Sequence, residues 1–124
     1  MATEHTHLII RALVSKPPTD PEIASNWLQA LVPAIGMKTL LGPYATYCSV
    51  PGNAGLTAAV IIETSHIVLH CWDESSPAEL QFDVYTCSSL NTETIFDALQ
   101  QFDPTSIEYK ILDRTTNLTI VRET

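Results

Sequence analysis

Short segments of alternating polarity, rather than long helical ones, are the feature that most constrains the fold of this 124-residue chain. The segments are rich in β-branched and aromatic residues, and turn-forming residues separate them, which is the pattern of half-buried β-strands. The predicted strands are 7–14, 39–49, 56–63, 66–72, 80–87 and 107–114, with a possible seventh at 118–122.

Two stretches break this alternation with helical spacing. Asp20 is a good N-cap with Pro21 at the first helical position, and apolar residues recur at helical spacing up to Gly36. A second helix is predicted after Asn91 and ends before Asp103, which precedes a proline. The order β-α-β-β-β-β-α-β predicts a single domain over 1–124 of the α/β (α+β) class. Its economical packing is a two-layer sandwich, with one mainly antiparallel sheet and two helices on one face.

Charge and composition exclude several classes of function. Fourteen acidic residues against six basic ones give a formal net charge of −8, so nucleic acid, whose phosphates need a basic face, is not an expected partner. The apolar runs are too short to span a membrane. Cys48, Cys71 and Cys87 are odd in number and not closely spaced, which predicts free thiols in a reducing compartment such as the cytoplasm. His5 and His7 have no third ligand at suitable spacing, so no metal site is predicted.

Two neighbouring strands each carry one polar face. In 66–72 the even-numbered residues, His70 among them, share a face, and in 80–87 the odd-numbered residues, Cys87 among them, do the same. If these polar faces coincide, His70 and Cys87 can approach each other.

The stretch from Leu56 to Ser88 resembles the small bacterial type of S-adenosylmethionine decarboxylase, a pyruvoyl enzyme. That family reads roughly Glu-Ser-His, then a strand ending in His, Thr-Trp-Pro-Glu, and finally Asp-hydrophobic-aromatic-Thr-Cys. The matching residues are Ser65, His66, His70, Trp72, Glu74, Asp83, Tyr85, Thr86 and Cys87. The motif region covers about a quarter of the chain, and the order of strands and helices agrees over nearly all of it.

The resemblance implies that the chain makes its own cofactor. Ser65 would attack the carbonyl of Thr64, the chain would split between them, and Ser65 would become a pyruvoyl group that forms a Schiff base with the amine of S-adenosylmethionine. By position, His70 inherits the role of processing base, Cys87 that of proton donor, and Thr57 that of a hydroxyl that assists processing. The implied activity is decarboxylation for polyamine (spermidine) synthesis, with no metal.

The sequence also departs from the family pattern. Thr64 stands where the family has glutamate, and its branched Cβ crowds the carbonyl that Ser65 must attack. The aromatic residue that stacks on adenine has no clear counterpart, and Tyr47 is the nearest candidate. Glu74 is either a ligand of ribose hydroxyls or a solvated loop acid.

These departures keep two other functions open. One is a pyruvoyl-dependent arginine or ornithine decarboxylase, which needs no adenine-stacking residue. The other is an uncleaved homologue that binds S-adenosylmethionine, or a partner protein, without decarboxylating anything.

The sheet face without helices would be a large apolar patch, which predicts a homodimer or a higher homo-oligomer with sites near the interface.

Overall fold

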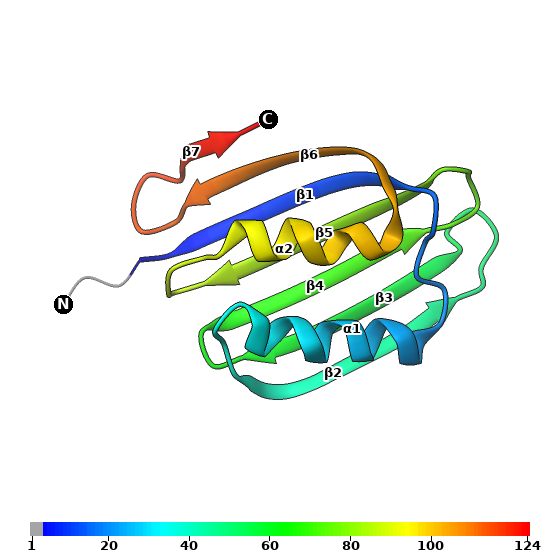
Figure 1. Cartoon of the computed structure of the whole chain (residues 1–124), viewed down its shortest axis with the longest axis horizontal. Coiled ribbons are helices and arrows are strands. Elements are labelled where there is room, and N and C mark those ends of the chain that lie inside the picture. Colours follow the sequence, from blue (N-terminus) through cyan, green and yellow to red (C-terminus); the bar gives the residue numbers. More distant parts are fainter. Residues whose placement is uncertain (1–3) are drawn as a thin grey trace.

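The computed structural model describes residues 4–124, which form one seven-stranded sheet with two helices packed against it (Figure 1). The strands are β1 Thr6–Val14, β2 Thr39–Cys48, β3 Gly55–Ile62, β4 Ser65–Trp72, β5 Ala78–Thr86, β6 Pro104–Asp113 and β7 Thr119–Glu123. The helices are α1 Pro21–Ala34 and α2 Thr92–Leu99, and a short 3-10 helix, Gln100–Phe102, follows α2.

The sheet has the order β2-β3-β4-β5-β1-β6-β7, and each neighbouring pair is antiparallel. The strands from β2 to β5 follow one another as hairpins, whereas β1 lies between β5 and β6, far from its sequence neighbours. The predicted two-layer α+β sandwich is therefore confirmed, and the possible seventh strand is present. The central position of β1 brings its residues beside those of β4 and β5.

Both helices begin where the sequence predicts. The side chain of Asp20 accepts a hydrogen bond from the backbone N–H of Glu22, and the side chain of Asn91 accepts one from Thr94. Each cap satisfies a backbone donor that the first helical turn leaves free, which stabilises a helix by about 1 kcal/mol. The helices lie on the same side of the sheet (Figure 1), and the indole N–H of Trp27 in α1 donates to the carbonyl of Ala98 in α2.

The core lies between the helices and one face of the sheet. In β4 the odd-numbered residues Ile67, Leu69 and Cys71 are buried, while the even-numbered residues between them are half-buried on the opposite face. The odd-numbered residues of β5 likewise point away from the core. The two polar faces therefore coincide, as the alternation predicts, on the face of the sheet that has no helix over it.

This open face carries apolar side chains as well as polar ones. Ile9 is 41% exposed and Ile61 is 46% exposed, on strands β1 and β3. Exposed apolar side chains on a continuous sheet surface favour contact with a partner. Among residues 4–124 no helix is long and apolar enough to cross a membrane.

Candidate active site

Ser65 lies at a strained turn. A two-residue turn, Glu63 and Thr64, joins β3 to β4, and Ile62 pairs with Ser65 to close the hairpin. Two-residue turns favour glycine because they require positive φ, yet neither residue of this turn is glycine. Ser65, the residue after the turn, has the positive φ instead. Its φ of 152° is in a region that residues other than glycine rarely adopt. The peptide link before Ser65 is thus held in a conformation of raised free energy.

The carbonyl of Thr64 has a specific hydrogen-bond donor. The backbone N–H of Cys87, one residue beyond the end of β5, donates to the oxygen of Thr64 at 3.0 Å. A donor at this position stabilises negative charge on the oxygen if a nucleophile attacks the carbonyl carbon. The hydroxyl of Thr64 is buried and, within the part of the chain that the structure describes, has no hydrogen-bond partner. This turn therefore combines a nucleophile, a polarised carbonyl and an unsatisfied polar atom.

Thr57 and His70 form a second group at the other end of β4. They face each other across β3 and β4, and the Thr57 hydroxyl and the His70 Nδ1 lie 3.0 Å apart, within hydrogen-bond distance. The His70 ring stacks on Trp72, with ring centroids 5.8 Å apart. An imidazole bonded to a hydroxyl can act as a base and activate that hydroxyl.

The strand register separates His70 from both Ser65 and Cys87. Ser65 lies five residues before His70 on the same strand, which is roughly 16 Å at about 3.3 Å per residue. His70 pairs with Gln81, and Cys87 lies six residues further along, roughly 20 Å away. The expectation that His70 and Cys87 approach each other within one chain is therefore wrong. The side chains share a face, but the antiparallel register sends them to opposite ends of it.

Tyr47 and Glu74 lie at the His70 end. The Tyr47 hydroxyl donates to both carboxylate oxygens of Asp73 at 2.9 Å, and this hydrogen bond raises the pKa of Tyr47 above its usual value. The carboxylate of Glu74 accepts hydrogen bonds from the backbone N–H groups of Gly52 and Ala54, at 2.9 and 3.2 Å. The Glu74 carboxylate therefore holds the loop between β2 and β3. To bind ribose hydroxyls as well, it would have to do so while keeping these bonds or after giving them up.

A pocket of about 260 Å³ opens beside His70. Its lining comes from β2, β3, β4 and the β2–β3 loop: Cys48, Asn53, Gly55, Leu56, Thr57, His70, Cys71 and Trp72. The indole N–H of Trp72 donates to the side-chain oxygen of Asn53, which fixes one wall. Gly55 is required there, because a Cβ at this position would lie 1.8 Å from the carbonyl oxygen of Cys71.

The thiols differ in their surroundings. Cys71 is 1% exposed in the core, and burial raises its pKa to about 12, so it has little thiolate character at neutral pH. Cys87 is half-buried at the Ser65 turn. Of the free cysteines at 48, 71 and 87, Cys87 is the one that lies next to the Thr64 carbonyl.

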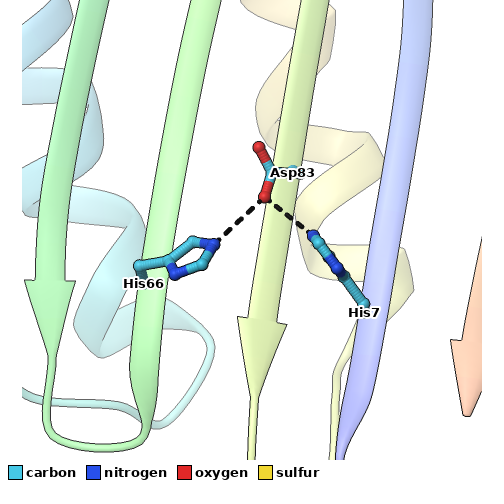
Figure 2. A group of neighbouring side chains, drawn as sticks. All are labelled: His7, His66 and Asp83. Carbon is cyan, nitrogen blue, oxygen red and sulfur yellow. Dashed lines mark hydrogen bonds and ion pairs between the residues drawn. The ribbon is translucent and has the colours of Figure 1, made fainter. Parts of the chain in front are cut away.

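A histidine and carboxylate group at the Ser65 end was missed by the sequence analysis. Asp83 Oδ2 lies 2.8 Å from His7 Nε2 and 3.3 Å from His66 Nε2 (Figure 2). Spacing along the chain could not reveal this group, because the three residues come from β1, β4 and β5, which only the fold makes neighbours. His7 therefore lies beside two potential metal ligands, His66 and Asp83, that its spacing from His5 along the chain does not reveal.

Comparison with known proteins agrees with this architecture. A family model described as S-adenosylmethionine decarboxylase matches residues 6–115. A crystal structure of the adenosylmethionine decarboxylase from Aquifex aeolicus VF5 superposes with a TM-score of 0.71 at 22% identity, over 92% of each chain. A search of curated proteins finds no significant match. Because the family model spans most of the chain, the chain belongs to the S-adenosylmethionine decarboxylase family of enzymes.

Proposed function

We propose that the protein decarboxylates S-adenosylmethionine with a pyruvoyl group derived from Ser65, and so supplies aminopropyl groups for polyamine synthesis. The observation that carries the proposal is the geometry of the Thr64–Ser65 link, where a strained serine follows a carbonyl that accepts a hydrogen bond from the Cys87 N–H. Three free cysteines favour the cytoplasm as its compartment.

Processing needs no reactant beyond the chain and water. The Ser65 hydroxyl oxygen bonds to the carbonyl carbon of Thr64 while the peptide C–N bond breaks, which leaves an ester and a free amine on residue 65. Removal of the Cα proton of residue 65 then expels the carboxylate of Thr64, and the resulting dehydroalanine hydrolyses with loss of ammonia. The Cys87 N–H stabilises the charge on the Thr64 oxygen during the first step.

The residues around Ser65 fit a pyruvoyl group. Such a group supplies a carbonyl that accepts the electron pair released when carbon dioxide leaves. Ser65 pairs with Thr86, so Cys87 stands at the same end of the sheet as the reacting atoms. Its thiol is half-buried there and is suited to return a proton to the decarboxylated carbon.

His70 and Thr57 are too far away to act on Ser65 of the same chain, so we infer that a second copy supplies them. If the open sheet faces of two copies meet about a two-fold axis perpendicular to the strands, the strands of the copies run in opposite directions, which places the His70 end of one over the Ser65 end of the other. The exposed side chains of Ile9 and Ile61 support such a contact. The pocket beside His70 would then lie across the interface from Ser65.

The charge of the chain suits the substrate. S-adenosylmethionine carries a sulfonium and an ammonium group, and a protein of net charge −8 attracts cations. The stacked His70 and Trp72 and the hydroxyl of Tyr47 offer the polar and aromatic surface that a nucleoside needs. Arginine or ornithine remains the alternative substrate, since Glu74, which could hold ribose hydroxyls, is bonded to the β2–β3 loop.

Two measurements test the proposal together. Intact-mass spectrometry of freshly purified and aged protein should show fragments of residues 1–64 and 65–124, and the cleaved preparation should release carbon dioxide from S-adenosylmethionine. Release from arginine or ornithine alone would support the alternative substrate. A single full-length mass after prolonged incubation, with S-adenosylmethionine still bound in calorimetry, would instead support the uncleaved binding protein.

A further inference from the structure

We propose that His7, His66 and Asp83 form a binding site for a divalent transition-metal ion on the open face of the sheet. His7 lies on β1, Asp83 on β5 and His66 on β4, three strands that are adjacent in the sheet. Figure 2 shows both imidazoles pointing at the carboxylate from either side. This inference does not depend on the proposed decarboxylation.

The distances match those between ligands of one ion. The ligand atoms of the three residues all lie within 4.8 Å of one another. A Zn²⁺ ion binds nitrogen and oxygen at about 2.0–2.2 Å, so its ligand atoms stand roughly 3.3 Å apart in a tetrahedron. Asp83 Oδ2 lies 2.8 Å from His7 Nε2 and 3.3 Å from His66 Nε2. Small side-chain rotations therefore suffice to enclose an ion.

The exposure and number of the three side chains suit an ion that also binds water. In the single chain the side chains of His7, His66 and Asp83 are 17%, 41% and 27% exposed, so packing holds the site and an ion can reach it. In the proposed dimer, the sheet of the second copy would cover this face. Two imidazoles and one carboxylate are the donor set of Zn²⁺, Co²⁺ and similar ions, and three protein ligands leave a position for water. Because the ligands come from three paired strands, the backbone holds them in place before the ion arrives.

Arg114 stabilises a metal-free arrangement of His7 that competes with metal binding. Its guanidinium lies 3.8 Å above the Tyr85 ring, and its NH1 group donates to His7 Nδ1 at 3.2 Å. Neutral His7 then carries its proton on Nε2 and donates it to Asp83, as the 2.8 Å contact requires. Metal binding at Nε2 moves that proton to Nδ1 and releases Arg114, which is exposed and can turn away. Arg114 thus weakens metal binding without touching the ion.

The test uses the full-length Ser65→Ala chain, which cannot self-process, so that one species is present. Calorimetric titration with Zn²⁺ should give one site per chain, and Zn²⁺ should raise Tm because it binds the folded state. His66→Asn and Asp83→Asn should weaken binding by more than about 10-fold, since even partners of metal ligands contribute about 10-fold to 100-fold. Arg114→Gln should tighten binding, a result that a general loss of folding would not give.

Matched controls separate this site from others. Glu79→Gln alters a half-buried carboxylate on the same face of β5, where it pairs with Arg11, and should leave the affinity unchanged. His70→Asn should do the same for a histidine of the same strand as His66. Co²⁺ should give a visible spectrum without a sulfur-to-cobalt charge-transfer band. The proposal is overturned by the absence of saturable binding, by full binding in Asp83→Asn, or by a spectrum that shows thiolate ligation.

Discussion

The backbone N–H of Cys87 donates a hydrogen bond to the carbonyl oxygen of Thr64, with an N···O distance of 3.0 Å. In the proposed mechanism this one residue therefore offers two separate groups to the same site, a backbone donor for processing and a thiol for turnover. The two contributions can be separated, because a side-chain substitution leaves the backbone donor in place whereas proline removes it.

We expect Cys87→Ala to self-process at a rate close to that of the unaltered chain but to turn over substrate poorly. Cys87→Pro should slow processing by about 10²–10³-fold, which is the effect of removing one donor to a developing oxyanion. Time courses of intact mass measure processing, and released carbon dioxide measures turnover. Circular dichroism must show that Cys87→Pro is folded, and equal processing of the two variants would exclude a role for the N–H.

The strain at Ser65 predicts a difference between two variants that both lack the nucleophile. Ser65→Ala keeps a side chain at φ 152°, whereas Ser65→Gly relieves strain of about 1–3 kcal/mol and loses about 0.5–1 kcal/mol through the flexibility of the unfolded chain. The glycine variant should be more stable by about 1 kcal/mol, or roughly 3–5 °C in Tm.

Thermal unfolding of the two uncleaved proteins checks this expectation. Glycine is ordinarily the less stable of the pair within a strand, so the sign alone is diagnostic. As a control, Ala58→Gly replaces a buried alanine of β3 that does not have positive φ, and it should destabilise the protein. A lower Tm for Ser65→Gly than for Ser65→Ala would show that the turn is not strained.

The sequence predicts what depends on local pattern. Alternation places His70 on the open face of β4, and the caps Asp20 and Asn91 start both helices. Register and long-range pairing lie beyond local pattern, because they depend on which residues meet across strands. The distance from His70 to Cys87 is set by the pairing of His70 with Gln81, which the two polar faces alone do not reveal.

The group of His7, His66 and Asp83 shows the same limit. Local pattern predicts that His66 and Asp83 share a face, but not that β1 inserts beside β5 and brings His7 to them. Glu74 is a further case. Its bonds to the N–H groups of Gly52 and Ala54 depend on the path of the β2–β3 loop, about which strand alternation says nothing.

Burial of Cys71 predicts a pH dependence of stability. Its pKa is about 12 in the folded protein, above the value of about 8.5 for an exposed thiol. Between these values the unfolded chain has lost the thiol proton that the folded chain keeps. Stability should therefore fall as the pH rises from about 9 towards 12, by at most about 1.4 kcal/mol per pH unit from this group.

Urea unfolding under reducing conditions at pH 8 and pH 10 measures this fall. Cys71→Val fills a similar volume and has no proton to lose, so its loss of stability over the same interval should be smaller. Cys48→Ser changes a thiol that is half-buried and should keep the full dependence. Identical pH dependence in Cys71→Val and the unaltered chain would exclude Cys71 as the cause.

Complementation between subunits tests whether His70 acts on Ser65 of a second copy. Ser65→Ala lacks the nucleophile and His70→Ala lacks the base, whose loss should slow processing by about 10²–10⁴-fold. Neither should cleave alone at a normal rate. In a mixed dimer, Ser65 of the His70→Ala chain faces His70 of the Ser65→Ala chain, so one complete site forms and only the His70→Ala chain should be cleaved. Co-expression of the two chains with different tags, followed by intact-mass spectrometry, distinguishes them.

Thr57→Ala should behave like His70→Ala in this mixture, because the two residues share a 3.0 Å contact and would be supplied by the same subunit. A mixture in which neither chain is cleaved, although light scattering shows a dimer, would place the base elsewhere than at His70 of the partner.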